Sequence, residues 1–276
     1  MSYLERSVNL LPWFVRDNIR KVPGIAYLQR LVFNTYLAGR RFKYTINAGP
    51  AKGLNLAITL PDDKLLWTGT WEKEIADLIA QSVPIGSIAL DVGAHRGFFG
   101  GVMALNGARQ VWAFEPNPGN VAALNGLLEL NPELPIEVLP VAVTDHDGTA
   151  MFDLMPEDTM GKLSGSEFQY GVDSEAKFKV EVRSLDSLLA ERNWQGVGII
   201  KIDVEGAELS VLKGATTLLT TWQPLLVIEI HTFKLLQECT AFLNRYGYQT
   251  RIVESGIHPD EESSFKVCHL EAICTT

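Results

Sequence analysis

The chain has 276 residues, of which 46% are hydrophobic and 21% charged, and its formal net charge is −9. This composition excludes collagen-like, largely disordered and disulfide-scaffold proteins, and the length suits one large domain with an extension. The three cysteines form no Cys-x-x-Cys pair, which argues against a zinc site and favours a reducing compartment. No run of about 18 apolar residues is present, and the short apolar stretch around Pro12 lacks the pattern of a secretory signal. We therefore expect no membrane-spanning helix and a cytoplasmic location.

Residues 1–45 differ in charge from the rest of the chain, with a formal charge of +6 against −15 for the remainder. The acidic body does not suggest a nucleic-acid binder, because neutralisation of phosphates dominates the affinity of such proteins. Within the segment, Pro23-Gly24 separates two predicted helices, so we expect a helical extension over 1–45. Two interpretations stay open. The extension packs on the main domain or on a second subunit of a homo-oligomer, or it contacts an anionic membrane surface or a carrier protein.

From about residue 50 the pattern alternates between short apolar runs and amphipathic segments. Strands are predicted over 54–60, 87–92, 110–114, 136–143, 197–204 and 225–230, and helices over 71–81, 97–105, 118–130, 207–219 and 233–246. Such alternation predicts parallel βαβ units, so the fold class is α/β, with a doubly wound, mostly parallel sheet in a domain over 46–276. Two further strands, 248–253 and 266–274, have no helix between them and are expected to form an antiparallel pair at one edge.

A different stretch, residues 145–184, lies between the third and fourth strands of the buried series. It contains one expected strand at 149–154, followed by residues rich in Gly, Ser, Glu and Asp. Long loops are uncommon in compact domains and often cover a site, so two interpretations remain, a loop over the site or a mobile insertion.

The strongest local signal is the sequence DVGAHRG at 91–97, where a buried strand ends and a helix begins. Gly93 allows a tight turn, and Gly97 allows the helix to approach strand and ligand closely. The free amides at the helix start would face that ligand. Asp91, at the strand end, can accept hydrogen bonds from an amine or a hydroxyl. The spacing differs from the G-x-G-x-x-G of dinucleotide sites.

Glu115 ends the next strand, 24 residues after Asp91. A carboxylate in this place can accept hydrogen bonds from both ribose hydroxyls of a nucleoside. Together with the glycine turn it predicts an adenosine ligand, and the turn spacing favours S-adenosylmethionine over NAD.

Two later strands end in ionisable residues. Lys201, Asp203 and Glu205 alternate at the end of one strand, and Glu229 and His231 at the end of the next. The carboxyl ends of parallel strands face the ligand crevice of such a sheet, and histidine accepts protons near neutral pH. A purely structural Lys201–Asp203 pair and a structural histidine are the alternatives that stay open.

These motifs resemble, in this order, those of the FkbM family of S-adenosylmethionine-dependent methyltransferases. The resemblance covers about residues 67–235, and its most specific part is KIDVEGAE. It rests on the segments DVGAHRG (91–97), AFEPNP (113–118), LPVAVTD (139–145), IKIDVEGAELSVLKGA (200–215) and IEIH (228–231).

The resemblance implies a class I, Rossmann-like sheet of seven strands, the last of them antiparallel, with S-adenosylmethionine as cofactor. The cofactor-binding positions that it implies are Asp91, Gly93, Ala94 and Gly97 in the turn, Glu115 at the ribose, Ala142 near the adenine and Glu72 facing the methionine end. The family commonly has Asn-Ile where this chain has His95-Arg96, and whether these side chains serve cofactor or substrate stays open.

Members of the family are commonly O-methyltransferases, so the expected activity is methyl transfer to a hydroxyl of a sugar, glycolipid or natural product. The candidates for base or substrate contacts are Asp203, Glu205, Glu229 and His231, with Asp203 or His231 as the expected base. The sequence does not require a metal ion. Two other functions remain open, an NAD-dependent oxidoreductase and a non-catalytic nucleoside-binding module of the same fold. The missing G-x-G-x-x-G and Y-x-x-x-K motifs count against the first.

Overall fold

The structure is a computed structural model that describes residues 41–59, 63, 65–66, 71–155, 161–164, 176–254 and 262–275. Residues 1–40 of the predicted helical extension therefore lie outside the described residues. Its last five residues are an exception and correct the prediction, because they form strand β1 (Arg41–Thr45) rather than helix. Among the described residues, none of the helices has the length and apolar character needed to cross a membrane.

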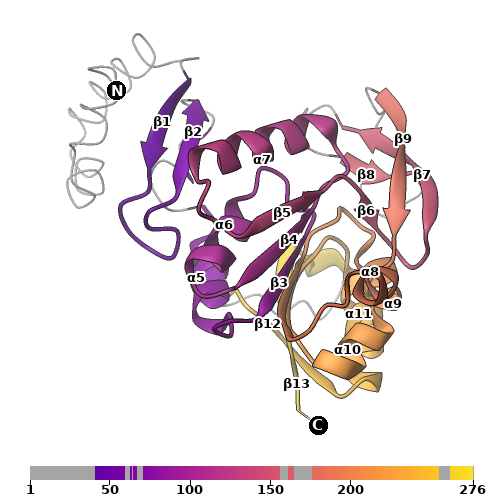
Figure 1. Ribbon diagram of the computed structural model, residues 1–276. Coiled ribbons are helices and arrows are strands. Elements are labelled where there is room, and N and C mark those ends of the chain that lie inside the picture. Colours follow the sequence, from indigo (N-terminus) through magenta and orange to yellow (C-terminus); the bar gives the residue numbers. More distant parts are fainter. Residues whose placement is uncertain are drawn as a thin grey trace.

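A seven-stranded sheet forms the centre of the molecule, in the order β12-β13-β11-β10-β3-β4-β5 (Figure 1). The five strands from β11 to β5 are parallel, whereas β13 runs antiparallel to both of its neighbours. This confirms the predicted fold class and the antiparallel pair at one edge. The strands are β3 (Ile88–Val92), β4 (Gln110–Phe114), β5 (Ile136–Leu139), β10 (Val197–Ile202), β11 (Leu225–Ile230), β12 (Tyr248–Ile252) and β13 (Cys268–Cys274).

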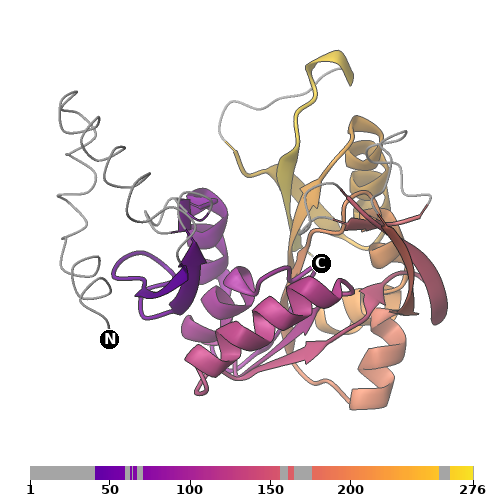
Figure 2. The same cartoon turned by 90° about the horizontal axis from the view of Figure 1, so that it is seen from above.

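Helices cover both faces of this sheet, since its central strands are apolar on both sides. One face packs against α8 (Leu185–Arg192), α9 (Glu208–Lys213), α10 (Thr216–Trp222) and α11 (Phe233–Arg245). The other packs against α5 (Lys73–Ser82), α6 (Phe98–Leu105), α7 (Pro118–Leu130) and the hairpin of β1 and β2 (Asn55–Thr59). Figure 2 shows this hairpin at the outer side of the helical layer.

Two predicted elements are each split in two. The strand predicted over 136–143 ends at Leu139, because Pro140 has no N–H to donate, and β6 (Ala142–Val143) joins a different sheet. The helix predicted over 207–219 breaks at Gly214 into α9 and α10. A Cβ on Gly214 would overlap the carbonyl oxygen of Thr144, so this position needs glycine for a close approach.

Most of the described part of residues 145–184 forms a second sheet and not a loop. Its order is β6-β9-β7-β8, with β7 (Gly148–Leu154), β8 (Gly161–Leu163) and β9 (Ala176–Arg183). The predicted strand at 149–154 is thereby confirmed. Phe152, Val180 and Val182 form a small core under this sheet, so the insertion has its own apolar support.

Asn131 ties the β1–β2 hairpin to the end of α7. Its side chain is 1% exposed. Its Oδ1 accepts the backbone N–H of Asn55 at 2.9 Å, and its Nδ2 donates to the carbonyl oxygens of Asn55 at 2.8 Å and Leu127 at 2.7 Å. Two of these hydrogen bonds fix the hairpin against the helical layer, and the third, to Leu127, anchors the amide to α7 itself.

We predict that Asn131→Ala lowers the free energy of unfolding by about 3 kcal/mol, because buried backbone groups lose their partners. Urea unfolding followed by circular dichroism measures the change. Asn125→Ala, at an exposed position of the same helix, is the matched control and should change stability by less than about 0.5 kcal/mol. Equal losses in the two variants would contradict the role given to Asn131.

Candidate active site

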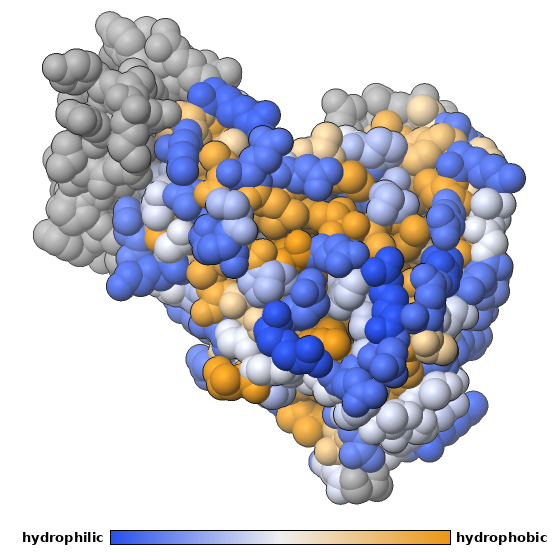
Figure 3. Space-filling model, in the orientation of Figure 1, coloured by the Kyte–Doolittle hydropathy of each residue, from blue (hydrophilic) through white to orange (hydrophobic). Residues whose placement is uncertain are grey.

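A cavity of about 850 Å³ opens at the carboxyl ends of β3, β4, β10 and β11. This is where ligands bind in doubly wound sheets, because the strand ends there leave free backbone and polar side chains. The face shown in Figure 3 carries a patch of hydrophobic side chains in its middle, with hydrophilic side chains on both sides. The second sheet contributes Phe152 and Leu163 to the cavity wall, so the interpretation of 145–184 as a cover of the site agrees with the structure.

The turn after β3 requires glycine at two positions. Gly93 has φ 79° and Gly97 has φ 85°, in the left-handed region that other residues rarely adopt. A Cβ on Gly93 would also overlap the carbonyl oxygen of Asp203 at the end of β10. The N–H groups of Gly93 and Ala94 donate to the carbonyl oxygen of Phe114, at 3.0 and 2.9 Å, which ties the turn to β4.

The carboxylate of Glu115 is held by the backbone on both of its oxygens. The N–H of His95 donates to Oε2 at 2.8 Å, and the N–H of Asn117 donates to Oε1 at 2.9 Å. Burial raises the pKa of Glu115 to about 7, although these N–H groups and the Asn120 side chain favour the ionised form. The side chain is 4% exposed and lines the cavity, so it is a fixed acceptor of hydrogen bonds.

Lys201 and Asp203 form an ion pair beside this turn, with 2.8 Å between Nζ and Oδ2. The ammonium also lies 5.0 Å from the ring centre of Phe99. Burial alone would raise the pKa of Asp203, but Lys201 and His231 outweigh it and lower the pKa to about 2. The structural pair that the sequence left open is thus present.

Asp91 lies beneath the turn and outside the cavity lining, with 1% of its surface exposed. Neither of its carboxylate oxygens has a hydrogen-bond partner among the described residues. Burial raises its pKa to about 6, and the charge of Lys201 opposes this rise.

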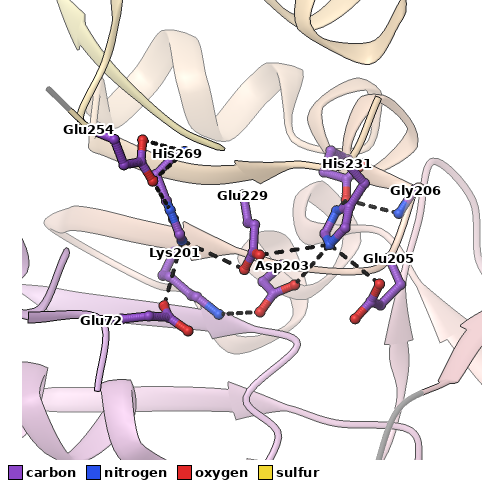
Figure 4. Close-up of polar contacts among 10 residues, drawn as sticks. Glu72, Lys201, Asp203, Glu205, Gly206, Glu229, His231, Glu254 and His269 are labelled. Carbon is purple, nitrogen blue, oxygen red and sulfur yellow. Dashed lines mark hydrogen bonds and ion pairs between the residues drawn. The ribbon is translucent and has the colours of Figure 1, made fainter. Parts of the chain in front are cut away.

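His231 is enclosed by carboxylates (Figure 4). Its Nδ1 lies 2.8 Å from Oε1 of Glu208, and its Nε2 lies 3.3 Å from Oε2 of Glu205. Asp203 and Glu229 each have an oxygen 3.9 Å from the same Nε2. Burial lowers the pKa of His231, but Glu208 first and then Glu205 outweigh it and raise the pKa to about 9. With carboxylates facing both ring nitrogens, the geometry does not favour His231 as the proton acceptor.

Glu208 was quoted within the KIDVEGAE motif but had no predicted role. It is 0% exposed, and besides His231 it accepts the N–H of Gly206 at 2.9 Å. Glu208 lies in the first turn of α9, on the side that faces the core. A glutamate is rarely buried without a partner, so this position could have indicated a buried basic partner such as His231.

A second histidine, His269, lies on the other side of Glu229 and was not predicted. It comes from β13, directly opposite Glu229 in the strand register. Its Nε2 lies 3.6 Å from an oxygen of Glu229 and 3.6 Å from Oε2 of Glu72, and its Nδ1 lies 2.6 Å from Oε1 of Glu254. Burial lowers the pKa of His269, but Glu229 and Glu254 outweigh it and raise the pKa to about 9. The sequence alone does not place His269 at the site, because its position follows from the pairing of β13 with β11.

The structure brings most of the predicted residues to one cavity and leaves three behind its wall. Asp91, Gly97 and His231 do not line the cavity. The predicted residues that do line it are Glu72, Gly93, Ala94, Glu115, Ala142, Asp203, Glu205 and Glu229.

His95 and Arg96, the departure from the usual family motif, both line the cavity. Arg96 is engaged by Asp63, with 2.7 Å between Nη1 and Oδ1. Burial and the neighbouring Arg96 lower the pKa of His95 to about 4, so His95 is neutral at pH 7. Only one of these two side chains is therefore charged at the cavity wall, and that charge is paired.

The sheet with its antiparallel β13 and the glycine turn after β3 define a methyltransferase of the class I type. Residues 91–250, more than half of the chain, match the methyltransferase FkbM domain. The chain belongs to the FkbM methyltransferase family and is a methyltransferase, as the sequence predicted. The match gives no support to the oxidoreductase alternative.

Two curated relatives share this similarity. The chain is 25% identical over 193 residues to the hexuronic acid methyltransferase AglP of Haloferax volcanii, covering 69% of this chain and 74% of that protein. It is 29% identical over 161 residues to the 2-O-methyltransferase NoeI of Sinorhizobium fredii, covering 54% of this chain and 64% of that protein.

Among solved structures, the chain is similar to the methyltransferase FkbM from Methylobacillus flagellatus. The two are 21% identical with a TM-score of 0.47, over 67% of this chain and 43% of the other. The chain thus spans less than half of the length of that relative.

Proposed function

We propose that this protein transfers a methyl group from S-adenosylmethionine to a hydroxyl of a sugar, as the free glycan, a glycolipid or a glycosylated natural product. The observation that carries the proposal is the division of one cavity into two ends. A carboxylate fixed by two backbone N–H groups, Glu115, follows β4 on one side of β3. On the other side of β3, Asp203 and Glu205 follow β10, and Glu229 lies at the end of β11. The first end suits a ribose and the second suits a cation and a hydroxyl.

The side chains present fit the cofactor. Each oxygen of Glu115 accepts one backbone N–H and keeps a lone pair for a ribose hydroxyl. Ala142 and its apolar neighbours Val141 and Val143 line the cavity and offer a surface for a flat base. Glu72 and Asp203 line the cavity and add negative charge for the cationic methionine end, with buried Asp91 behind them. When bound, the cofactor supplies a methyl group on a positively charged sulfur.

The group proposed to accept the proton from the acceptor hydroxyl is Glu205. Asp203 is occupied by the ammonium of Lys201, and both ring nitrogens of His231 face carboxylates. Glu205 lines the cavity, and burial raises its pKa to about 7, within the range that suits a general base. Its Oε2 faces Nε2 of His231 at 3.3 Å, but this contact is not a hydrogen bond. Its φ of 52° lies in the left-handed region, which is unusual for a residue other than glycine. Asp203 and Glu229 remain as proposed contacts of the acceptor.

A sugar acceptor is supported by the wall and by the relatives. Trp71 and Phe152 line the cavity and offer apolar ring faces to the C–H groups of a pyranose, while the acids accept hydrogen bonds from its hydroxyls. The two curated relatives are named for methyl transfer to hexuronic acid and to a 2-oxygen.

The acceptor is testable with methyl-labelled S-adenosylmethionine and an extract of the native source. We expect label in a carbohydrate fraction, and we expect it to survive mild alkali, because a methyl ether resists hydrolysis and a methyl ester does not. Mass spectrometry of the labelled product measures both points. Label that is released by alkali, or that enters only protein or nucleic acid, would contradict the proposal.

Glu115→Gln should weaken binding of S-adenosylhomocysteine about 30-fold, since hydrogen bonds to a charged acceptor are lost. In the unchanged protein the affinity should fall as the pH drops below about 7, because the pKa of Glu115 is about 7 and the protonated carboxyl is a poorer acceptor. Isothermal titration between pH 6 and pH 8 measures both effects. Glu133→Gln, at an exposed position beyond α7, is the control. An unchanged affinity in Glu115→Gln would remove the basis of the ribose assignment.

Glu205→Gln should lower kcat about 10³-fold at pH 8 while affinity for S-adenosylhomocysteine changes less than about twofold. The reason is that the amide cannot accept a proton but preserves the shape of the wall. Initial rates of label transfer to the purified acceptor measure kcat, and Glu238→Gln on the surface of α11 is the control. A normal kcat in Glu205→Gln would show that another group is the base.

A further inference from the structure

Three ionisable side chains converge at the cavity wall, beside the end proposed for the methionine part of the cofactor. Glu72 precedes α5, Glu229 lies in β11 and His269 lies in β13. One ligand atom from each lies within 4.8 Å of the other two. The convergence is visible in Figure 4, where Glu72 and His269 approach each other and Glu229 approaches His269 from the neighbouring strand.

The orientation of His269 is fixed from behind by Glu254. The Nδ1 atom lies 2.6 Å from Oε1 of Glu254, and the backbone N–H of His269 donates to the same carboxylate. With Nδ1 engaged, the other nitrogen, Nε2, points at Glu72 and Glu229. The side chain is 7% exposed, and Nε2 has no hydrogen-bond partner among the described residues. In metal-binding histidines, the ring nitrogen that does not bind the ion commonly donates a hydrogen bond to a carboxylate, which fixes the orientation of the ring.

The spacing of these atoms is too wide for hydrogen bonds. Nε2 of His269 lies 3.6 Å from each of the two carboxylates, beyond the normal range of about 2.7–3.2 Å. Ligand atoms with bonds of ~2.1 Å to a tetrahedral ion lie ~3.4 Å apart. Oε2 of Glu72 also lacks a hydrogen-bond partner, and φ at Glu72 is 37°, in the left-handed region. An unpartnered oxygen therefore lies at ligand distance, on a residue whose backbone conformation is strained.

We propose that Glu72, Glu229 and His269 bind a divalent transition-metal ion of the Mn²⁺ or Zn²⁺ type. One imidazole and two carboxylates form a mixed ligand set that suits these ions better than Ca²⁺ or Mg²⁺, which prefer oxygen alone. Glu72 and Glu229 line the cavity, so the remaining coordination positions of the ion face it. The ion goes beyond the proposed function, because methyl transfer to a hydroxyl does not depend on it.

A neighbouring cluster, Asp203, Glu205 and His231, has a similar composition but is less suited to an ion. The ammonium of Lys201 already lies 2.8 Å from Asp203 and supplies positive charge there. Glu72, Glu229 and His269 form no ion pair with a lysine or arginine among the described residues, and the charge of Lys201 reaches Glu72 only without direct contact.

The test uses the full chain, freed of metals by a chelator and saturated with S-adenosylhomocysteine, and titrates it with Mn²⁺. The electron paramagnetic resonance signal of free Mn²⁺ measures binding, and Zn²⁺ is added as a competitor. We expect one bound equivalent. His269→Gln should weaken it at least tenfold because it removes a ligand, and Glu254→Gln should weaken it about 10-fold to 100-fold because it releases the orientation of His269.

Two controls make the outcome decisive. His146→Gln removes an exposed histidine and should leave the binding unchanged. Unaltered affinity for S-adenosylhomocysteine shows that each variant is folded, and it separates failure of the ion site from failure of the proposed function. The proposal is overturned if no Mn²⁺ or Zn²⁺ binds at 1 mM, if His269→Gln binds as the unchanged protein does, or if Glu205→Gln alone abolishes binding.

Discussion

The site depends on the close backbone approach between the turn after β3 and the end of β10. Gly93 contacts the backbone carbonyl of Asp203 so closely that a single methyl group would overlap it. The N–H of Asp203 in turn donates to the carbonyl oxygen of Val92 at 2.9 Å. The turn after β3 and the end of β10 are therefore joined by backbone contacts alone. Their side chains are free to face the cavity, which is why Asp203 and Glu205 stand beside the glycine turn.

A second consequence is the position of Glu115. The carbonyl oxygen of Phe114 accepts two N–H groups of the turn, and the next residue then accepts the N–H of His95 through its side chain. Three hydrogen bonds therefore join the turn to the end of β4. A carboxylate fixed in this manner loses little entropy on binding a diol, since its orientation is set before the ligand arrives. The end of the cavity proposed for the ribose is preorganised for this reason.

The sequence predicts the position of a site residue well when that position follows from the local pattern of its own strand. It predicts the position poorly when it follows from pairing with distant strands. Asp203 and Glu115 end short apolar runs, so their places at the carboxyl edge follow from the parallel sheet alone. The ends of β5 and α9 were predicted less well. Pro140 and Gly214 are ordinary breakers, but the sheet that β6 joins depends on contacts with β9. His269 depends on the register of an antiparallel strand placed between β12 and β11, which no local pattern determines.

The acids around the two histidines are too many for the basic groups among them. Glu72, Glu229 and Glu254 face His269, while Asp203, Glu205 and Glu208 face His231 and Lys201. Six carboxylates therefore share three basic side chains, and all lie in or behind the wall of one cavity. Negative charge that is partly removed from water and not fully paired costs free energy. A cation that enters the cavity lowers this cost, whereas an anion raises it. The same excess therefore favours the proposed sulfonium cofactor over a phosphate-bearing nucleotide.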